Sequence, residues 1–234
     1  MRILAIDTSV GSGSVAALDA GGSVDRPLGP AGGHARVLTE ALADVAATRG
    51  WGPLGSLGPE DVIAVVRGPG SFTGLRVGVA AAKALAWATG ARLVGVSGFE
   101  VLAARAARLA DWRDEHLAIA YDAGRGEVYA AVATPTAGGW TITTPALMPL
   151  AAWIDGLPRG SRITGPALDL AADATATRPD LVMAAAEVRH PAALDAAALA
   201  GARAEAGETD DPLTLIPDYL RPSYAEEPKP PAAG

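Results

Sequence analysis

The chain has 234 residues, of which 19 are Lys or Arg and 26 are Asp or Glu, so its formal charge is −7. Half of the residues are hydrophobic, 19% are charged and none is cysteine. A chain of this length and apolar content can bury a core, either as one large domain or as two small lobes. The composition excludes a disordered chain, a disulfide framework, an iron–sulfur cluster, a thiolate zinc site and a cysteine nucleophile. The acidic balance also argues against a protein that grips nucleic acid through its own phosphate contacts.

The first half of the sequence predicts three strands followed by alternating helices and strands, in the order βββαβαβα. Apolar residues at spacings of three and four predict the helix over 34–49, and a continuous β-branched run over 62–66 predicts a buried central strand. The expected strands cover residues 3–6, 14–18, 23–28, 62–66 and 93–96, and the expected helices cover 34–49, 72–89 and 100–109.

The second half begins again with three expected strands and then turns to helices. The strands are expected over 117–121, 127–133 and 140–143, and the helices over 150–154, 167–174 and 192–205. Two such halves predict an α/β protein with two ribonuclease-H-like lobes of the actin-like ATPase (ASKHA) superfamily, with mixed sheets flanked by helices. We expect the lobes to cover residues 1–107 and 108–222, followed by a disordered, proline-rich tail over 223–234.

The apolar runs of the sequence are short. The longest, residues 77–88, is interrupted by Lys83 and falls well short of the roughly 20 residues that span a bilayer. The first residues hold too few apolar positions for a secretory signal. We therefore expect a cytoplasmic protein with no membrane partner.

The most informative stretch is RGPGSFTGLRVGVAAAKALA, residues 67–86, where a strand ends and a helix begins at once. The helix N-terminus could hold an anion, although the glycine spacing fits neither a Walker A loop nor GxGxxG. The other interpretation is a tight strand-to-helix corner. The turn over residues 7–9 also has two interpretations. Asp7 either faces phosphates, as in actin-like folds, or caps its own hairpin. Together the two segments predict a vestigial phosphate loop at Asp7, Thr8, Ser9, Gly68, Gly70 and Ser71.

The helix over 72–89 is apolar nearly all round, so it must be buried on more than one side. Gly74 and Gly78 form a smooth face that allows close approach of another element. A second apolar face is expected either to pack within the lobe or to meet another subunit, and it contains Val77, Val79, Ala80, Ala84 and Trp87.

The remaining candidates for chemistry are weak. The segment over 121–132 resembles a second phosphate loop at three residues only, and we favour a solvated hairpin tip. His34, His116 and His190 are isolated in the sequence, so a histidine-bound metal is not expected. No G-x-S-x-G nucleophile elbow occurs. The sequence therefore predicts no catalytic residue and no metal site.

Five blocks in order along the chain resemble the TsaB family of bacterial tRNA threonylcarbamoyladenosine biosynthesis proteins. They are ILAIDTS, GPGSFTGLRVGVAAAKALA, VSGFEVLA, DAGRGEVYAA and PDYLR. The fourth block departs from the family at Gly124, where Arg is more common. The resemblance implies an actin-like fold related to the catalytic subunit TsaD but degenerate, since the TsaD pair of metal-binding histidines four residues apart is missing here.

The resemblance further implies a non-catalytic scaffold subunit. The expected complex transfers a threonylcarbamoyl group to N6 of adenosine 37 in tRNAs that read ANN codons. TsaD is the expected heterodimer partner, TsaE docks on that pair, tRNA is met only through the complex, and the chain alone forms a homodimer. The isolated chain is expected to bind no cofactor strongly, with ATP or ADP placed at the complex interface. The alternatives are an ATP-dependent phosphotransferase and a glycoprotease-like peptidase.

The expected interface uses the helices over 34–49 and 72–89, in a four-helix arrangement with TsaD or a second copy. Five residues are predicted to carry it: Leu38, Leu42, Leu75, Val79 and Lys83.

Overall fold

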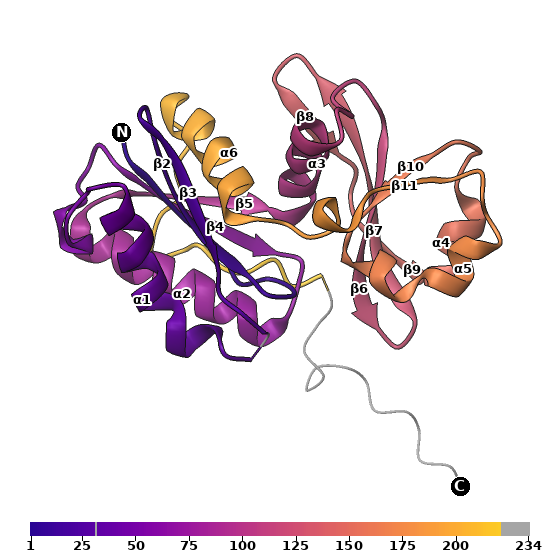
Figure 1. Cartoon of the computed structure of the whole chain (residues 1–234), viewed down its shortest axis with the longest axis horizontal. Coiled ribbons are helices and arrows are strands. Elements are labelled where there is room, and N and C mark those ends of the chain that lie inside the picture. The colour runs from indigo at the N-terminus through magenta and orange to yellow at the C-terminus, as the bar shows by residue number, and fades with distance from the viewer. Residues whose placement is uncertain (31, 221–234) are drawn as a thin grey trace, which may run out of the picture.

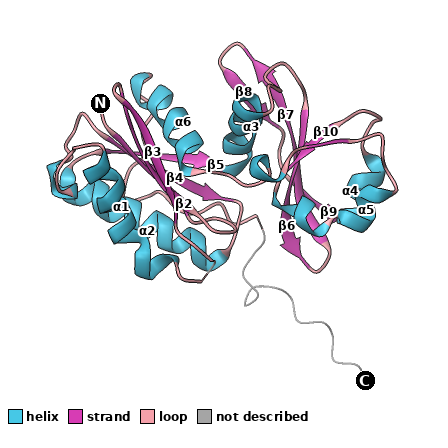
Figure 2. Cartoon of the chain, viewed as in Figure 1, coloured by secondary structure: helices cyan, strands magenta, loops and turns pink. Residues whose placement is uncertain are grey.

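The computed structural model describes residues 1–30 and 32–220, so the expected disordered tail over 223–234 lies outside the described residues. Two sheets, each flanked by helices, form two lobes that lie side by side (Figure 1). Helices and strands alternate in layers in both lobes, as Figure 2 shows. The predicted α/β class is confirmed.

The first half of the chain follows the predicted order. Its elements are β1 (Ile3–Asp7), β2 (Ser14–Asp19), β3 (Gly22–Pro27), α1 (His34–Thr48), the short 3₁₀ helix η1 (Leu54–Ser56), β4 (Val62–Gly68), α2 (Phe72–Thr89), β5 (Arg92–Ser97) and α3 (Gly98–Leu109). The sheet order is β3-β2-β1-β4-β5, in which β1, β4 and β5 are parallel and β2 and β3 are antiparallel.

Both faces of the first sheet are buried, which explains the continuous apolar runs over residues 3–6 of β1 and 62–66 of β4. Leu4 and Ile6 point to the face that α1 and α2 cover. Ile3 and Ala5 point to the opposite face, against α6 (Ala193–Glu205). Successive residues of a strand point to opposite sides, so a continuous apolar run is what a doubly covered strand needs.

The second half contains the three predicted strands and three more short ones. Its elements are β6 (Leu117–Gly124), β7 (Glu127–Thr136), β8 (Gly139–Ile142), β9 (Ala146–Pro149), α4 (Leu150–Gly156), β10 (Arg162–Thr164), η2 (Pro166–Leu170), α5 (Ala172–Ala176), β11 (Val182–Met183), η3 (Ala186–Val188) and α6. Strands β9, β10 and β11 have four, three and two residues, too few to leave a periodic pattern in the sequence.

The two sheets repeat one topology. The second sheet has the order β11-β10-β6-β7-β8, with β6, β10 and β11 parallel and β7 and β8 antiparallel, and β9 pairs with β7. Read from the other end, this order matches β3-β2-β1-β4-β5 strand for strand. The duplicated ribonuclease-H-like architecture therefore rests on strand pairing as well as on element order.

The expected division placed residues 108–222 in the second lobe, but the last part of this range lies on the first lobe. Helix α6 packs on the first sheet, and residues 210–220, here called the C-terminal strap, continue along the same lobe. The strap pairs with the edge strand β5 through the N–H of Asp210, which donates to the carbonyl of Leu93 at 2.8 Å, and it buries Leu215 in the first core. Helix α6 supplies most of the cover for the face of the sheet that holds Ile3.

Within the described ranges, no helix is long and apolar enough to cross a membrane.

Candidate functional site

The two segments of the predicted phosphate loop, residues 7–9 and 68–71, follow neighbouring parallel strands. β1 and β4 pair in register, with Ile3 opposite Val62, so their carboxyl ends open at the same edge of the sheet. We call this edge the first-lobe corner. It brings together the six predicted residues: Asp7, Thr8, Ser9, Gly68, Gly70 and Ser71.

Asp7 is fully buried and binds its own turn. The backbone N–H and the hydroxyl of Ser9 donate to Asp7 Oδ1 at 2.9 and 2.6 Å. Asp7 Oδ2 and the Tyr121 hydroxyl are buried without a hydrogen-bond partner among the described residues. Burial raises the pKa of Asp7, and burial together with the Asp7 charge raises the pKa of Tyr121 well above its ordinary value. The carboxyl group therefore caps a turn in the interior and is not presented to a ligand.

The two loops of the corner pack directly on each other. The N–H of Ser71 donates to the carbonyl of Ser9 at 2.7 Å, and the Thr8 hydroxyl donates to the carbonyl of Gly74 at 2.7 Å. A Cβ at Gly70 would lie 2.3 Å from the Ser9 carbonyl oxygen, and one at Gly74 would lie 2.1 Å from the Thr8 carbonyl oxygen. The glycines here serve backbone-to-backbone contact. No room is left between the loops for a phosphate group.

The C-terminal strap closes the corner from another side. The N–H of Asp218 donates to the carbonyl of Arg67 at 2.8 Å, and the two side chains form an ion pair at 3.3 Å. Gly68 lies under the strap, because a Cβ there would be 2.8 Å from the Asp218 carbonyl oxygen. The glycine that would have to approach a phosphate instead contacts the protein's own backbone.

A pocket of about 310 Å³ lies beside the corner, between the N-termini of α1 and α2. Its described lining includes the hydroxyl residues Thr8, Ser71 and Thr73 and the buried His34, whose Nε2 lies 3.2 Å from the carbonyl oxygen of Gly29. This lining contains neither a carboxylate nor a Lys or Arg side chain. The pocket therefore lacks the carboxylate that would hold the metal ion of a nucleotide and the Lys or Arg that would bind its phosphates.

The second-lobe hairpin between β6 and β7 is an exposed turn. Asp122 Oδ1 accepts a hydrogen bond from the N–H of Gly124 at 2.8 Å, and the Asp122 side chain is exposed. Gly124 and Gly126 have left-handed φ angles of 74° and 76°, which accounts for glycine at both positions. The favoured interpretation, a solvated hairpin tip, agrees with this geometry.

The side chains of the three histidines have different hydrogen-bond partners. His190 Nε2 lies 2.7 Å from Asp169 Oδ2, a pairing across 21 residues that sequence spacing did not reveal. His116 Nδ1 lies 3.1 Å from the Thr134 hydroxyl. Over residues 1–30 and 32–220, no three His, Asp or Glu side chains gather in a group that could hold a metal ion.

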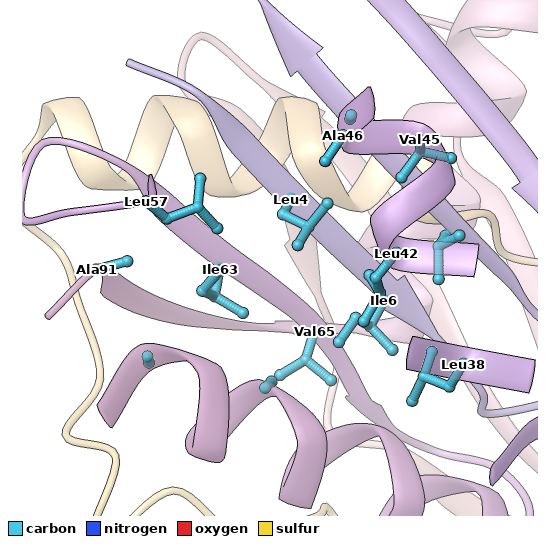
Figure 3. Close-up of a cluster of buried hydrophobic side chains, with 14 of the residues drawn as sticks. Leu4, Ile6, Leu38, Leu42, Val45, Ala46, Leu57, Ile63, Val65 and Ala91 are labelled. Carbon is cyan, nitrogen blue, oxygen red and sulfur yellow. The ribbon is translucent and has the colours of Figure 1, made fainter. Parts of the chain in front are cut away.

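Four of the five residues predicted for the partner interface lie in the core of the first lobe. Leu38, Leu42 and Val79 pack with Leu4 and Ile6 under the sheet, and Figure 3 shows Leu38 and Leu42 turned inward beside these strands. Leu75 is likewise only 1% exposed. The prediction placed these side chains on the wrong side of their helices, since a buried side chain is not available to another chain.

Lys83, the fifth of these residues, binds the C-terminal strap. Its Nζ donates to the carbonyls of Leu215 at 2.9 Å and Leu213 at 3.4 Å. Near the N-terminus of the same helix, Arg76 Nε donates to the Tyr219 hydroxyl at 3.0 Å, and its guanidinium carbon lies 3.7 Å from the Phe72 ring centroid. Both basic side chains of α2 thus hold the strap to the helix.

The side of α2 that faces solvent is opposite its glycines. Gly74 and Gly78 contact Thr8, so they mark the side that lies on the sheet. A helix turns 100° per residue, and the opposite side is occupied by residues spaced three to four apart that the structure leaves exposed. They are Arg76, Ala80, Ala84 and Trp87, the last 71% exposed. The position of the glycines in the sequence was the available signal for this face.

Comparison with known proteins gives consistent matches. The family model described as "TsaD: tRNA N6-adenosine threonylcarbamoyltransferase" matches residues 33–154, more than half of the chain. The tRNA threonylcarbamoyladenosine biosynthesis protein TsaB of Bacillus subtilis is 32% identical over 183 residues, which cover 73% of this chain and 74% of the relative. The chain belongs to the TsaB family.

Other TsaB relatives agree in sequence and in fold. The TsaB protein of Escherichia coli is 36% identical over 133 residues, 55% of this chain and 53% of the relative. The solved structure of YeaZ from Pseudomonas aeruginosa superposes with a TM-score of 0.78 at 28% identity and covers 94% of this chain and 99% of that one. The resemblance seen in the five sequence blocks is confirmed, and so is the fold of two actin-like lobes.

Proposed function

We propose that this TsaB-family chain is a non-catalytic subunit of the complex that places a threonylcarbamoyl group on N6 of adenosine 37 in tRNAs reading ANN codons. The observation that supports the non-catalytic role is the first-lobe corner, in which the Ser9 and Thr8 carbonyls contact Gly70 and Gly74 directly. A phosphotransferase of this fold needs open space and a presented carboxylate at this edge. Neither the phosphotransferase nor the peptidase alternative is favoured.

The proposed partner is TsaD, which meets this chain through the exposed side of α2 and the neighbouring α1. Ala80, Ala84 and Trp87 supply an apolar surface of small residues beside one large aromatic, a combination that permits close helix approach and a buried anchor. We further propose that TsaE docks on the resulting pair, that tRNA is met only in the complex, and that a second copy uses the same face when TsaD is missing.

The proposed face is tested by a substitution that introduces a charge on the exposed side of α2 without altering the core. Ala84→Glu should keep the Tm within about 2 °C, because surface substitutions rarely cost more than about 0.5 kcal/mol. It should weaken TsaD binding more than 100-fold, since an unpaired buried charge costs about 3 kcal/mol or more. Calorimetric titration with TsaD measures the affinity, and threonylcarbamoylation of tRNA by the reconstituted complex measures the activity.

Ala151→Glu is the matched control, because it makes the same change at an exposed position of α4 in the second lobe. It should leave TsaD binding and tRNA modification unchanged. Full TsaD affinity in folded Ala84→Glu protein would contradict the proposed face. Val79→Asp is unsuitable for this purpose, because Val79 is 3% exposed and its charge would disrupt the lobe itself.

The non-catalytic role is tested separately. Asp7→Asn should support tRNA modification at close to the parent rate when TsaD and TsaE are supplied, and the isolated chain should give no binding heat with ATP. A loss of more than about 100-fold in rate with normal TsaD binding is what removal of a catalytic group produces, and it would place Asp7 in the chemistry.

A further inference from the structure

The two lobes exchange their covering helices. Helix α3 follows the last strand of the first sheet, but its Phe99 and Leu102 pack on the second sheet with β6 and β7. Helix α6 follows the last strand of the second sheet, yet its alanines pack on the first sheet with β1 and β4. Figure 1 shows α3 and α6 next to each other between the sheets. Any rotation of one lobe against the other must slide one helix along the other.

A buried carboxylate ties one pair of helix ends. Asp195, in the first turn of α6, is 3% exposed. Arg105 of α3 donates to its Oδ2 at 2.9 Å, and Arg108 donates to Oδ1 at 2.8 Å and to Oδ2 at 3.0 Å. Both Asp195 oxygens are thus bound by guanidinium groups of the other lobe's helix. Sliding the helices apart would leave this carboxylate buried and unpaired, which is strongly unfavourable.

A second tie joins the opposite ends of the same helices. Arg203, in the last turn of α6, forms an ion pair with Glu100 in the first turn of α3 at 2.5 Å and donates to the carbonyl of Gly95 at 3.1 Å. The other Glu100 oxygen accepts from the N–H of Ser97, which fixes the start of α3. Because α3 and α6 are tied at both ends, the two helices cannot rotate about one tie without breaking the other.

The two points where the chain crosses between the lobes are also held. The N–H of Ala193, at the second crossing, donates to the Ser14 hydroxyl at 2.9 Å. At the first crossing, the Tyr121 hydroxyl of the second lobe fits against Gly98, where a Cβ would lie 2.4 Å from it. The backbone is therefore packed at the positions where a hinge needs freedom to turn.

We propose that these contacts form a lobe lock, by which the chain holds its two sheets at one fixed angle and does not close around a ligand. The residue on which the lock depends most is Asp195, since it is the buried member of the cluster. This property concerns the isolated chain and holds whether or not the proposed partner is correct. It adds a mechanical feature to the proposed role, because a partner bound to one lobe would find the other always in the same position.

The test is the distance between the lobes in solution. The sequence has no cysteine, so Ala20→Cys in the first lobe and Ala152→Cys in the second, both at exposed positions, give two unique sites for nitroxide labels. Pulsed electron–electron double resonance measures the distance between the two labels. Diluting the labelled chain with unlabelled chain ensures that the distance distribution comes from pairs of labels within one molecule. We expect a single narrow distance that does not change when ATP is added.

Asp195→Ala in the labelled chain should broaden or shift this distance and lower the Tm by on the order of 10 °C. If that variant does not fold, Asp195→Asn removes both ion pairs while keeping a side chain of nearly the same size in the buried position. The control is Asp180→Ala, which breaks a 2.9 Å ion pair with Arg178 inside the second lobe and should leave the distance unchanged.

Two results would overturn the lobe lock. One is a broad or two-peaked distance in the parent chain, which would show that the lobes already move. The other is an unchanged narrow distance in a folded variant that lacks the Asp195 tie, which would show that these contacts do not set the angle.

Discussion

The first-lobe corner and the second-lobe hairpin both lie beside the end of the first strand of their repeat, yet their glycines make very different contacts. In the corner, Gly70 and Gly74 contact the backbone of residues 8 and 9 so closely that a methyl group cannot be added. In the hairpin, a Cβ at Gly124 or Gly126 would meet nothing within 4 Å. Glycines beside the first strand of each repeat therefore serve different purposes.

The difference separates two uses of glycine. The hairpin glycines satisfy a left-handed backbone, whereas Gly70 and Gly74 allow two loops to close on each other. A sequence motif with glycine after a strand is typical of phosphate binding, but the same residues also suit a corner filled by its own backbone. Only the distance from each glycine to its neighbours decides between the two.

The largest expected effect is at the tightest contact of the corner. Gly74→Ala should lower the free energy of unfolding by about 3 kcal/mol or more, because its Cβ would overlap the Thr8 carbonyl and force α2 away from β1. Urea denaturation followed by circular dichroism measures the change. Gly138→Ala, in the open turn between β7 and β8, is the control and should cost less than about 1 kcal/mol. Equal effects at the two glycines would remove the contrast drawn between the lobes.

The next effect concerns the charge buried in the corner. Burial raises the pKa of Asp7 above its ordinary value of 3.8, so the unfolded chain releases this proton at lower pH than the folded chain. As pH rises from about 4, the folded state therefore loses stability through this group. Asp7→Asn lacks the titration, so its stability relative to the parent should rise as the pH increases above about 4.

Unfolding free energies of the two chains across this pH range measure the effect. The exposed Asp122→Asn in the hairpin is the matched control and should change stability by less than about 0.5 kcal/mol. A difference between parent and Asp7→Asn that stays constant with pH would mean that the Asp7 carboxyl group is not held away from water.

The smallest expected effect is the loss of one hydrogen bond. Thr8→Val keeps the shape of the side chain but removes the donor to the Gly74 carbonyl, and it should cost about 1 kcal/mol. The control is Thr141→Val, which makes the same change at an exposed position of β8 and should be close to neutral. A Thr8→Val protein as stable as the parent would show that glycine packing alone holds the corner together.

Much of the fold could be predicted because its signals are local. The runs that became β1 and β4 and the glycines that end α1 and α2 are visible in the sequence, and parallel neighbours necessarily place residues 7–9 beside residues 68–71. Strands β10 and β11 could not be predicted, because a few residues carry no periodicity. The return of α6 to the first lobe depends on tertiary packing, which no local pattern encodes.

Four of the residues predicted for the interface are buried within the lobe, and the sequence could not show this for a related reason. Spacings of three and four show that Leu38, Leu42 and Val79 share buried sides, but they do not show what buries them. A helix that packs on the sheet of its own lobe and a helix that packs on another subunit show the same spacing of apolar residues. The hydrogen bonds of Lys83 to the strap were equally out of reach, since they join residues more than 100 positions apart.

The return of α6 to the first sheet also sets a condition on how the chain can mature during synthesis. The face that bears Ile3 and Ala5 is completed by alanines made about 190 residues later. Until those residues leave the ribosome, the earlier half presents an unsheltered apolar surface to the cell. We therefore expect a fragment that stops after Leu109 to aggregate, and the two halves to become stable together as a single cooperative unit.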